Sequence, residues 1–275
     1  MFSTALVLAG MLSTAHAYVD PKCASIAAAG PPAGYSEQDQ QNYLLNYFAM
    51  ATTLSPLHGP VPHKSGHGSI GIDLSAIPPL GCERRLVLNY TKTEDTNKAP
   101  VVPRPRMIFA FPQWGKWTPY GGFAYAPPIP IFDTQNVIVS VEAGMGRYFG
   151  KSNWAAGWRF HHTLMKSVAE IATPFEEGEE AFDDFYMGST LGVDVLVSKD
   201  FDGLEPYLAV GMTDASTFFY IGDDAVVTNN TSPYFAPAVS LGLDIKKIKK
   251  LDTAVEFYAA PGVIYTGRLR LAYRW

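Results

Sequence analysis

The chain lacks long apolar runs: after its first residues, no segment reaches the ~18 consecutive apolar residues that a membrane-spanning helix needs. Charged residues are also scarce, at 17% of 275 residues, against about 25% in an average domain. The net charge is −5, and no stripe of basic residues is present. These shortages argue against a bundle of spanning helices and against nucleic acid as a partner.

Lysine and arginine are absent from the first 17 residues, which carry a short apolar run over residues 1–12. Ala15-His16-Ala17 follows and has the A-x-A pattern of a cleavage site. The sequence therefore predicts a signal peptide over residues 1–17, with cleavage before Tyr18, and export of the chain.

Cysteine is limited to Cys23 and Cys82. An even count in an exported chain predicts one disulfide between them, and two free buried thiols are the alternative. Two isolated cysteines supply too few ligands for a metal site.

From about Gly66 onward, apolar residues recur at every second position. In each such segment the apolar row is uninterrupted, and the opposite row mixes small residues with acids, as in Val137–Met145, Leu191–Val197, Val239–Ile245 and Leu251–Phe257. Side chains alternate faces along a strand. The pattern is typical of a transmembrane β-barrel, with apolar residues toward lipid and polar residues toward the lumen.

The last nine residues show this alternation most clearly. Leu269, Leu271, Tyr273 and Trp275 share one face, and Arg268, Arg270 and Arg274 lie on the other. This strand resembles the C-terminal signature of Gram-negative outer-membrane barrel proteins, an alternating strand closed by Phe or Trp. The resemblance implies an outer-membrane location, contact with membrane lipid and lipopolysaccharide, and recognition of this strand by the barrel-assembly machinery.

The predicted connectors alternate in length, as expected for short periplasmic turns and longer extracellular loops. We predict an all-β, antiparallel up-and-down barrel over residues 66–275, with about 10–12 strands. Ten segments, which include one at 83–91, have the strand pattern, and residues 67–77 make an eleventh. Bacterial single-chain barrels have even strand numbers. Twelve is therefore favoured, with one strand in the N-terminal zone, and ten is the alternative, with residues 67–77 outside the barrel. An exported soluble lipocalin-like barrel or β-sandwich is the competing fold.

Residues 18–65 form a separate zone with one predicted helix near Glu37–Thr53, followed by a proline-rich stretch. The layout loosely resembles the plugged outer-membrane transporters of long-chain fatty acids, which implies a lumen plug. If Cys82 lies in a short periplasmic turn, residues 67–77 run toward the periplasm and the helix rises through the lumen. A periplasmic helix or a twelfth strand are the alternatives.

Alternation places several charged side chains inside the predicted barrel, as a polar pore lining or as a salt-bridge lattice. They are Glu142, Asp194, Asp244, Glu256, Arg268, Arg270 and Arg274, with Arg159 as a further candidate. We predict a passive, porin-like channel or transporter for small solutes, hydrophobic ones included, with no enzymatic activity and no cofactor. The alternative is a structural barrel whose loops act in surface interaction.

Two weaker patterns involve histidine. His67 and Ser69 share a strand face, a spacing similar to that of outer-membrane phospholipases and lipid A deacylases, which gives a lipid hydrolase as a third function. His58, His63 and His67 lie on no regular element, so the sequence predicts no metal site.

The segment 176–184 is rich in carboxylates. It is interpreted as a solvated surface loop, and a binding site for a divalent cation is the alternative.

Overall fold

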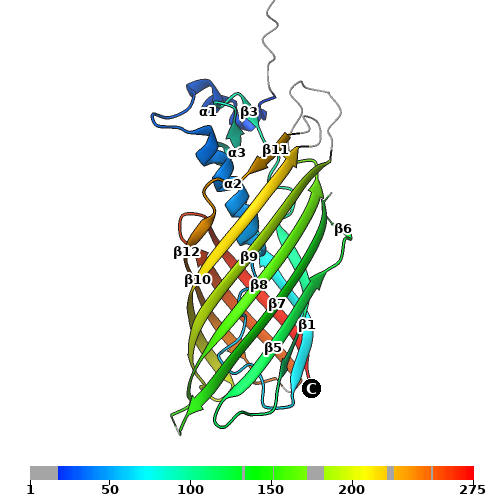
Figure 1. Cartoon of the computed structure of the whole chain (residues 1–275), viewed down its shortest axis with the longest axis vertical. Coiled ribbons are helices and arrows are strands. Elements are labelled where there is room, and N and C mark those ends of the chain that lie inside the picture. The colour runs from blue at the N-terminus through cyan, green and yellow to red at the C-terminus, as the bar shows by residue number, and fades with distance from the viewer. Residues whose placement is uncertain (1–17, 132–133, 151, 172–182, 222–225, 249) are drawn as a thin grey trace, which may run out of the picture.

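In a computed structural model, the chain forms a tall barrel of tilted strands with a small helical head at one end (Figure 1). The structure describes residues 18–131, 134–150, 152–171, 183–221, 226–248 and 250–275. Ten strands in these ranges close into one antiparallel barrel, because β1 pairs with β14 as well as with β4. The ten are β1 (Gly68–Ala76), β4 (Val101–Ala110), β5 (Thr118–Ala126), β7 (Thr134–Phe149), β8 (Trp154–Ala169), β9 (Asp184–Lys199), β10 (Leu204–Ile221), β12 (Tyr234–Ile245), β13 (Leu251–Ala260) and β14 (Ile264–Arg274).

The smaller elements lie before the barrel or in its connections. They are η1 (Pro21–Cys23), α1 (Ala24–Ala29), α2 (Glu37–Thr52), α3 (Cys82–Arg85), β2 (Leu86–Val87), β3 (Lys92–Thr93), β6 (Pro130–Ile131) and β11 (Val226–Asn229). Among the described residues, no helix combines the length and the apolar character needed to cross a membrane.

The predicted fold class is confirmed, but the favoured strand number was wrong: the barrel has ten strands, not twelve. The segment 83–91, predicted as a barrel strand, instead forms α3 and β2, and β2 pairs only with β3. Leu88, Asn89 and Tyr90 have φ of 51°, 56° and 69°. Left-handed backbone at three consecutive positions reverses the chain, so an extended strand cannot continue through them.

The connections differ between the two ends of the barrel. At one end, called here the short-turn end, the joins are residues 111–117, 150–153, 200–203 and 246–250. At the other, the long-loop end, they are residues 77–100, 127–133, 170–183 and 222–233, plus the brief turn 261–263. The chain end at Trp275 lies at the short-turn end (Figure 1). Of the acidic segment 176–184, residues 176–182 lie outside the described part of the chain.

The direction of β1 corrects one prediction. Ser69 pairs with Arg274 and Ser75 with Arg268, so β1 starts at the short-turn end and runs toward the long loops. Cys82 therefore lies at the long-loop end and not in a short periplasmic turn. The prediction failed because it counted residues 83–91 as a barrel strand, which reversed the assigned direction of every element before it.

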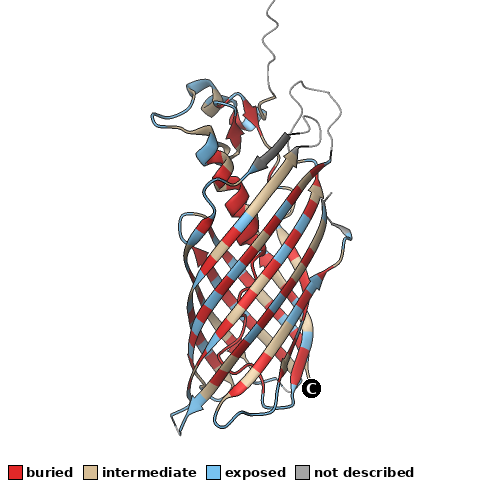
Figure 2. Ribbon diagram, in the orientation of Figure 1, coloured by how far each residue is buried: buried red, intermediate tan, exposed pale blue. Residues whose placement is uncertain are grey.

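The outer wall of the barrel is apolar. Along the strands, buried and exposed residues alternate, as the banding in Figure 2 shows. The exposed rows include Val193 (51% exposed), Val195 (60%) and Leu241 (59%), and similar residues lie on neighbouring strands. Soluble monomers rarely expose an apolar surface that is continuous over many strands. In a soluble lipocalin-like barrel or β-sandwich, the apolar row of each strand would face a dry core. In this barrel the apolar row faces outward.

A substitution in the middle of this wall distinguishes a lipid environment from water. Val193 pairs with Phe160 of β8 and Met212 of β10. Val193→Arg is expected to lower the free energy of unfolding from phospholipid bilayers by about 2–4 kcal/mol, the cost of Arg near the midplane of a membrane barrel. The control Ser25→Arg, on the exposed α1, should change it by less than about 0.5 kcal/mol. An equally small effect of Val193→Arg would contradict a lipid-facing wall.

The long-loop half of the interior is filled by α2. Ser36 caps the helix by accepting a hydrogen bond from the Asp39 N–H at 3.2 Å. Leu44, Tyr47 and Met50 pack against wall residues such as Tyr258 and Ile264. Most of the helix surface is buried, as expected of a helix surrounded by a barrel.

Candidate functional site

The segment Thr53–His63, called here the lumen strap, continues from α2 through the short-turn half of the barrel. Residues 53–63 are all buried, and none belongs to a helix or strand. Pro56, Pro60 and Pro62 lack a backbone N–H and interrupt any regular hydrogen-bonding pattern. The carbonyl groups of such a segment need partners from elsewhere, since buried backbone groups are almost always paired.

Arginines of the wall provide these partners. Four consecutive carbonyl oxygens, at residues 52–55, each accept a hydrogen bond from a different guanidinium. The pairs are Arg104 Nη1 to Thr52 O (2.8 Å), Arg268 Nη1 to Thr53 O (2.8 Å), Arg159 Nη2 to Leu54 O (2.5 Å) and Arg106 Nη1 to Ser55 O (3.1 Å). We call these four residues the arginine clamp.

The position of the clamp follows from the end of the helix. Thr52 is the last residue of α2, whose final carbonyls have no partner within the helix and form the negative end of its dipole. Arg268 Nη2 also reaches Met50 O, at 3.3 Å. The clamp thus satisfies the helix end and the first strap residues together, from strands β4, β8 and β14.

Glu142 balances the charge of the clamp. Its carboxylate lies 2.5 Å from Arg106 Nη2, 3.3 Å from Arg159 Nη1 and 3.4 Å from His58 Nε2 on the strap. Asp73 pairs with Arg106 at 2.9 Å and Asp194 with Arg159 at 3.0 Å. Arg106 and Arg159 therefore each meet two carboxylates, which offsets the cost of burying their charge. Among the described residues, Arg104 and Arg268 pair with no carboxylate and donate to carbonyl or hydroxyl oxygens instead.

Nearer the short-turn end, the strap meets a second set of charged side chains. The Leu57 N–H donates to Glu256 Oε2 at 3.0 Å, and the Tyr207 hydroxyl donates to the same oxygen at 2.7 Å. Lys246 Nζ donates to Val61 O at 3.2 Å and contacts Glu205 at 2.7 Å. Burial opposes the charge of Lys246, but Asp244 and Glu205 outweigh it and raise the pKa of the ammonium.

One glycine shows how closely the strap approaches the wall. A Cβ on Gly146 of β7 would lie 2.1 Å from the carbonyl oxygen of Pro60. Contact at that distance requires the strap or the strand to move. The absence of a side chain at this inward position therefore makes room for the strap backbone.

The structure places the predicted lumen residues unequally. Glu142, Asp194, Asp244, Glu256, Arg268 and Arg270 are buried in the interior. Arg274 is only half-buried and donates to Lys246 O at 3.2 Å, at the short-turn rim. The further candidate Arg159 belongs to the clamp. Leu271, Tyr273 and Trp275 are exposed on the outer wall, at 42%, 50% and 44%, and Leu269 is partly exposed.

Sequence reasoning missed half of the clamp and several of its partners. Arg104 and Arg106 belong to it, and Asp73, Glu205, Lys246 and Asp252 complete the charge balance. In β4, Arg104, Arg106 and Ile108 occupy every second position, so strand alternation could have predicted that they share one face. The structure buries all three. No sequence pattern could have placed His58 and His63 in the interior, because the strap residues belong to no helix or strand and follow no helical or strand periodicity.

The structure gives His67 and Ser69, the predicted hydrolase pair, different hydrogen-bond partners. His67 Nδ1 lies 2.9 Å from Trp275 O, whereas Ser69 Oγ is buried and bonds to His63 Nε2 at 2.8 Å and to Arg270 at 2.5 Å. His63 Nε2 also lies 3.7 Å from Asp252, so one ring nitrogen meets both neighbours. Within the described ranges, no three His, Cys, Asp or Glu side chains are arranged to hold a metal ion.

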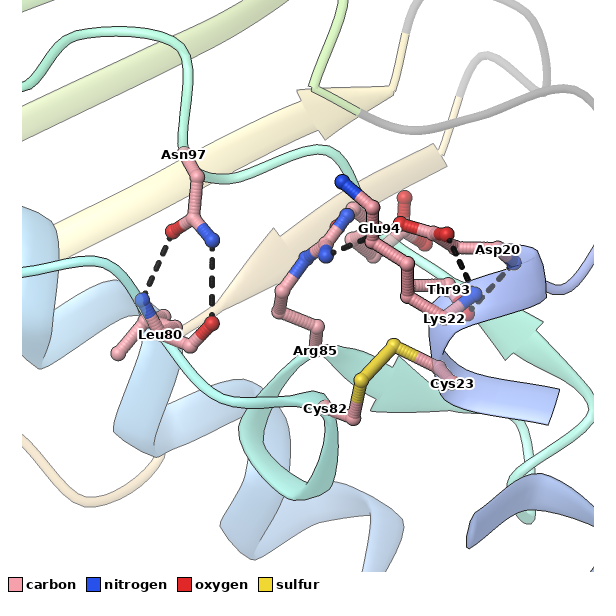
Figure 3. Close-up of a disulfide and its surroundings, with 9 residues drawn as sticks. All are labelled: Asp20, Lys22, Cys23, Leu80, Cys82, Arg85, Thr93, Glu94 and Asn97. Atoms are coloured by element: carbon pink, nitrogen blue, oxygen red, sulfur yellow. Dashed lines mark hydrogen bonds and ion pairs between the residues drawn. A yellow bond between two sulfur atoms is a disulfide. The ribbon is translucent and has the colours of Figure 1, made fainter. Parts of the chain in front are cut away.

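The predicted disulfide is confirmed: Cys23 and Cys82 are bonded, with Cα atoms 5.4 Å apart (Figure 3). It joins residues 18–35 to residues 78–100, and we call these two segments the cap. Arg85 adds an ion pair with Asp20 at 3.3 Å and a hydrogen bond to Glu94 O at 3.0 Å. Asn97 exchanges two hydrogen bonds with the backbone of Leu80, at 2.8 and 3.0 Å. The cap is therefore a cross-linked unit above the long-loop end.

One cavity reaches the strap at the short-turn end, and another lies beside α2. One of about 750 Å³ opens at the short-turn end and is lined by His63, Lys246 and Arg274, among others. A small one of about 50 Å³ lies beside α2, between Phe48, Met165 and Tyr186. Neither is lined by Glu142 or by a clamp arginine. The clamped part of the strap separates the two.

Comparisons with known proteins give distant structural similarities. No protein-family model matches the chain, and no curated protein matches it in sequence. Ail, the attachment invasion locus protein of Yersinia pestis, is 12% identical with a TM-score of 0.32, over 77% of this chain and 100% of Ail. The Pseudomonas putida toluene transporter TodX is 11% identical with a TM-score of 0.39, over 89% of this chain and 77% of TodX.

The translocator domain of the autotransporter NalP from Neisseria meningitidis is 11% identical with a TM-score of 0.37, over 96% of this chain and 100% of that domain. At these scores, the similarities assign this chain to no family and to no activity.

Proposed function

We propose that this protein is an integral outer-membrane barrel of a Gram-negative bacterium, sealed by its own N-terminal segment, which presents the cross-linked cap at the cell surface. The apolar outer wall supports insertion in a membrane. The contrast between short turns and long loops is that of bacterial outer-membrane barrels, whose short turns face the periplasm. In the proposed orientation the cap lies outside the cell.

The arginine clamp is the observation that carries the sealed state. A mobile plug would have to break four charge-assisted hydrogen bonds to buried carbonyls, each worth about 1.5–3 kcal/mol. It would also leave four arginines to be solvated again. The strap is thus integral to the barrel, and the cap and long loops are the surfaces left for contact with other molecules. No step of the proposed role requires a catalytic residue or a cofactor.

A channel that opens when the strap leaves is the second candidate. The cavity at the short-turn end favours it, because it already extends from the rim to His63. Small solutes, hydrophobic ones included, would then pass where the strap now lies.

Surface exposure of the cap tests the proposed role. Gly34 lies in an exposed turn with open space around it, so an epitope inserted after Gly34 is expected to bind antibody on intact cells. An epitope inserted after Asp202, in a turn at the opposite end, should bind only after the outer membrane is permeabilised. The reverse pattern would place the cap in the periplasm and overturn a surface role.

A further inference from the structure

The tryptophans gather at one end of the barrel. The sequence has five: Trp114 and Trp117 in or beside the β4–β5 turn, Trp154 and Trp158 at the start of β8, and Trp275 at the end of β14. All five therefore lie at or near the short-turn end. Tryptophan is enriched at membrane–water interfaces, so this end marks one boundary of the membrane.

Two cations lie among these aromatic rings, on the outer wall. The guanidinium of Arg147 lies 4.8 Å from the ring centre of Trp117 and 4.5 Å from that of Phe149. The ammonium of Lys199 lies 5.4 Å from the ring centre of Trp154 and 5.0 Å from that of Phe201. We call these six residues the interface patch.

Strand register makes the patch continuous. Trp154 pairs with Phe149 on one side and with Lys199 on the other. Ala156 pairs with Arg147 and with Val197 in the same way. Arg147 and Lys199 are therefore separated by one strand, β8, and by two residues along it, which is about 12 Å at two strand spacings and two residue rises. Between and above them the wall is apolar, with Val197 and Trp158 exposed.

The two cations have no carboxylate partner among the described residues. Arg147 Nε is buried without a hydrogen bond. Of the nearby acids, Asp200 accepts the Gly203 N–H at 2.6 Å, and Asp202 lies in the same turn. Cations outnumber these two acids at this end, where Lys64, Lys116, Lys247 and Lys250 also lie. Unpaired cations at a membrane boundary favour an anionic group from the membrane itself.

We propose that the interface patch binds anionic phospholipid of the periplasmic leaflet. The phosphate meets Arg147 and Lys199, which the rings hold in place by cation–π contacts. The acyl chains lie along the apolar wall above Ala156 and Val197. The inference depends on the proposed membrane placement, but not on the sealed lumen or the role of the cap.

Native mass spectrometry of the full chain in neutral detergent, titrated with phosphatidylglycerol or phosphatidylcholine, tests the proposal. The protein is expected to prefer phosphatidylglycerol, and this preference should fall as salt is raised. Arg147→Gln and Lys199→Gln should each weaken phosphatidylglycerol binding about fivefold, and the double variant about thirtyfold. Lys166→Gln is the matched control: Lys166 also lies over a ring, that of Phe185 at 4.8 Å, but toward the long-loop end. It should change the affinity by less than about twofold.

Two outcomes would overturn the proposal: a folded double variant that keeps the wild-type preference, or a control that loses as much. If the double variant does not fold, Trp117→Leu with Trp154→Leu keeps both cations and removes two of their rings. That variant should bind phosphatidylglycerol less tightly, and unchanged binding would count against the patch. A protein that inserts into bilayers without any lipid preference would overturn this inference alone, whereas one that fails to insert would overturn the membrane placement.

Discussion

Glu142→Gln is expected to lower the free energy of unfolding by about 3 kcal/mol, since removing one partner of a buried ion pair costs about 3–5 kcal/mol. Glu142 meets two clamp arginines and His58 of the strap. The lower end of the range applies because Arg106 keeps Asp73 and Arg159 keeps Asp194. Urea-induced unfolding of the membrane-inserted protein measures the change.

Glu170→Gln is the matched control for this measurement. Glu170 also pairs with a cation, Lys98 at 3.6 Å, but its side chain is 54% exposed. Exposed ion pairs contribute about 0–1 kcal/mol, so the control should change little. If Glu142→Gln and Glu170→Gln lowered the free energy of unfolding equally, Glu142 would not belong to a buried charge cluster that holds the strap.

The architecture of the wall could be predicted because it depends on a local rule. Side chains alternate along a strand, so Glu142, Asp194 and Glu256 could be assigned to the interior from their neighbours alone. The error over residues 83–91 has a local cause as well. Val87, Tyr90 and Thr91 are residue types that favour strands. Nothing in the side chains of Leu88 and Tyr90 indicates their left-handed backbone.

The clamp could not be predicted, because it depends on heights along the barrel axis. Register sets Glu142 opposite His161 and Arg159 opposite Asp194, and the sequence does not give that register. The strap raised a further difficulty. Its carbonyls bond to arginines 51 to 215 residues away, and a segment with three prolines reads as a connector.

Removal of the strap is the second change with a large expected effect. Three proteins are compared in planar bilayers: the full chain, a deletion of residues 18–65, and a chain in which residues 53–63 are replaced by a Gly–Ser sequence of equal length. The replacement keeps the connection between α2 and β1, so it serves if the deletion does not fold. The double variant Cys23→Ser with Cys82→Ser is the control, because it loosens the cap and leaves the clamp intact.

Single-channel conductance of these proteins tests most directly whether the strap seals the barrel. The full chain and the cysteine variant should insert without conductance steps, since the clamped strap separates the two cavities. The deletion should give resolvable steps, because only wall side chains remain in the lumen. The Gly–Ser replacement should give smaller steps, because α2 still occupies the long-loop half of the interior. Steps of the same size in the full chain and the strap-free protein would contradict a sealed barrel and make transport the function to pursue.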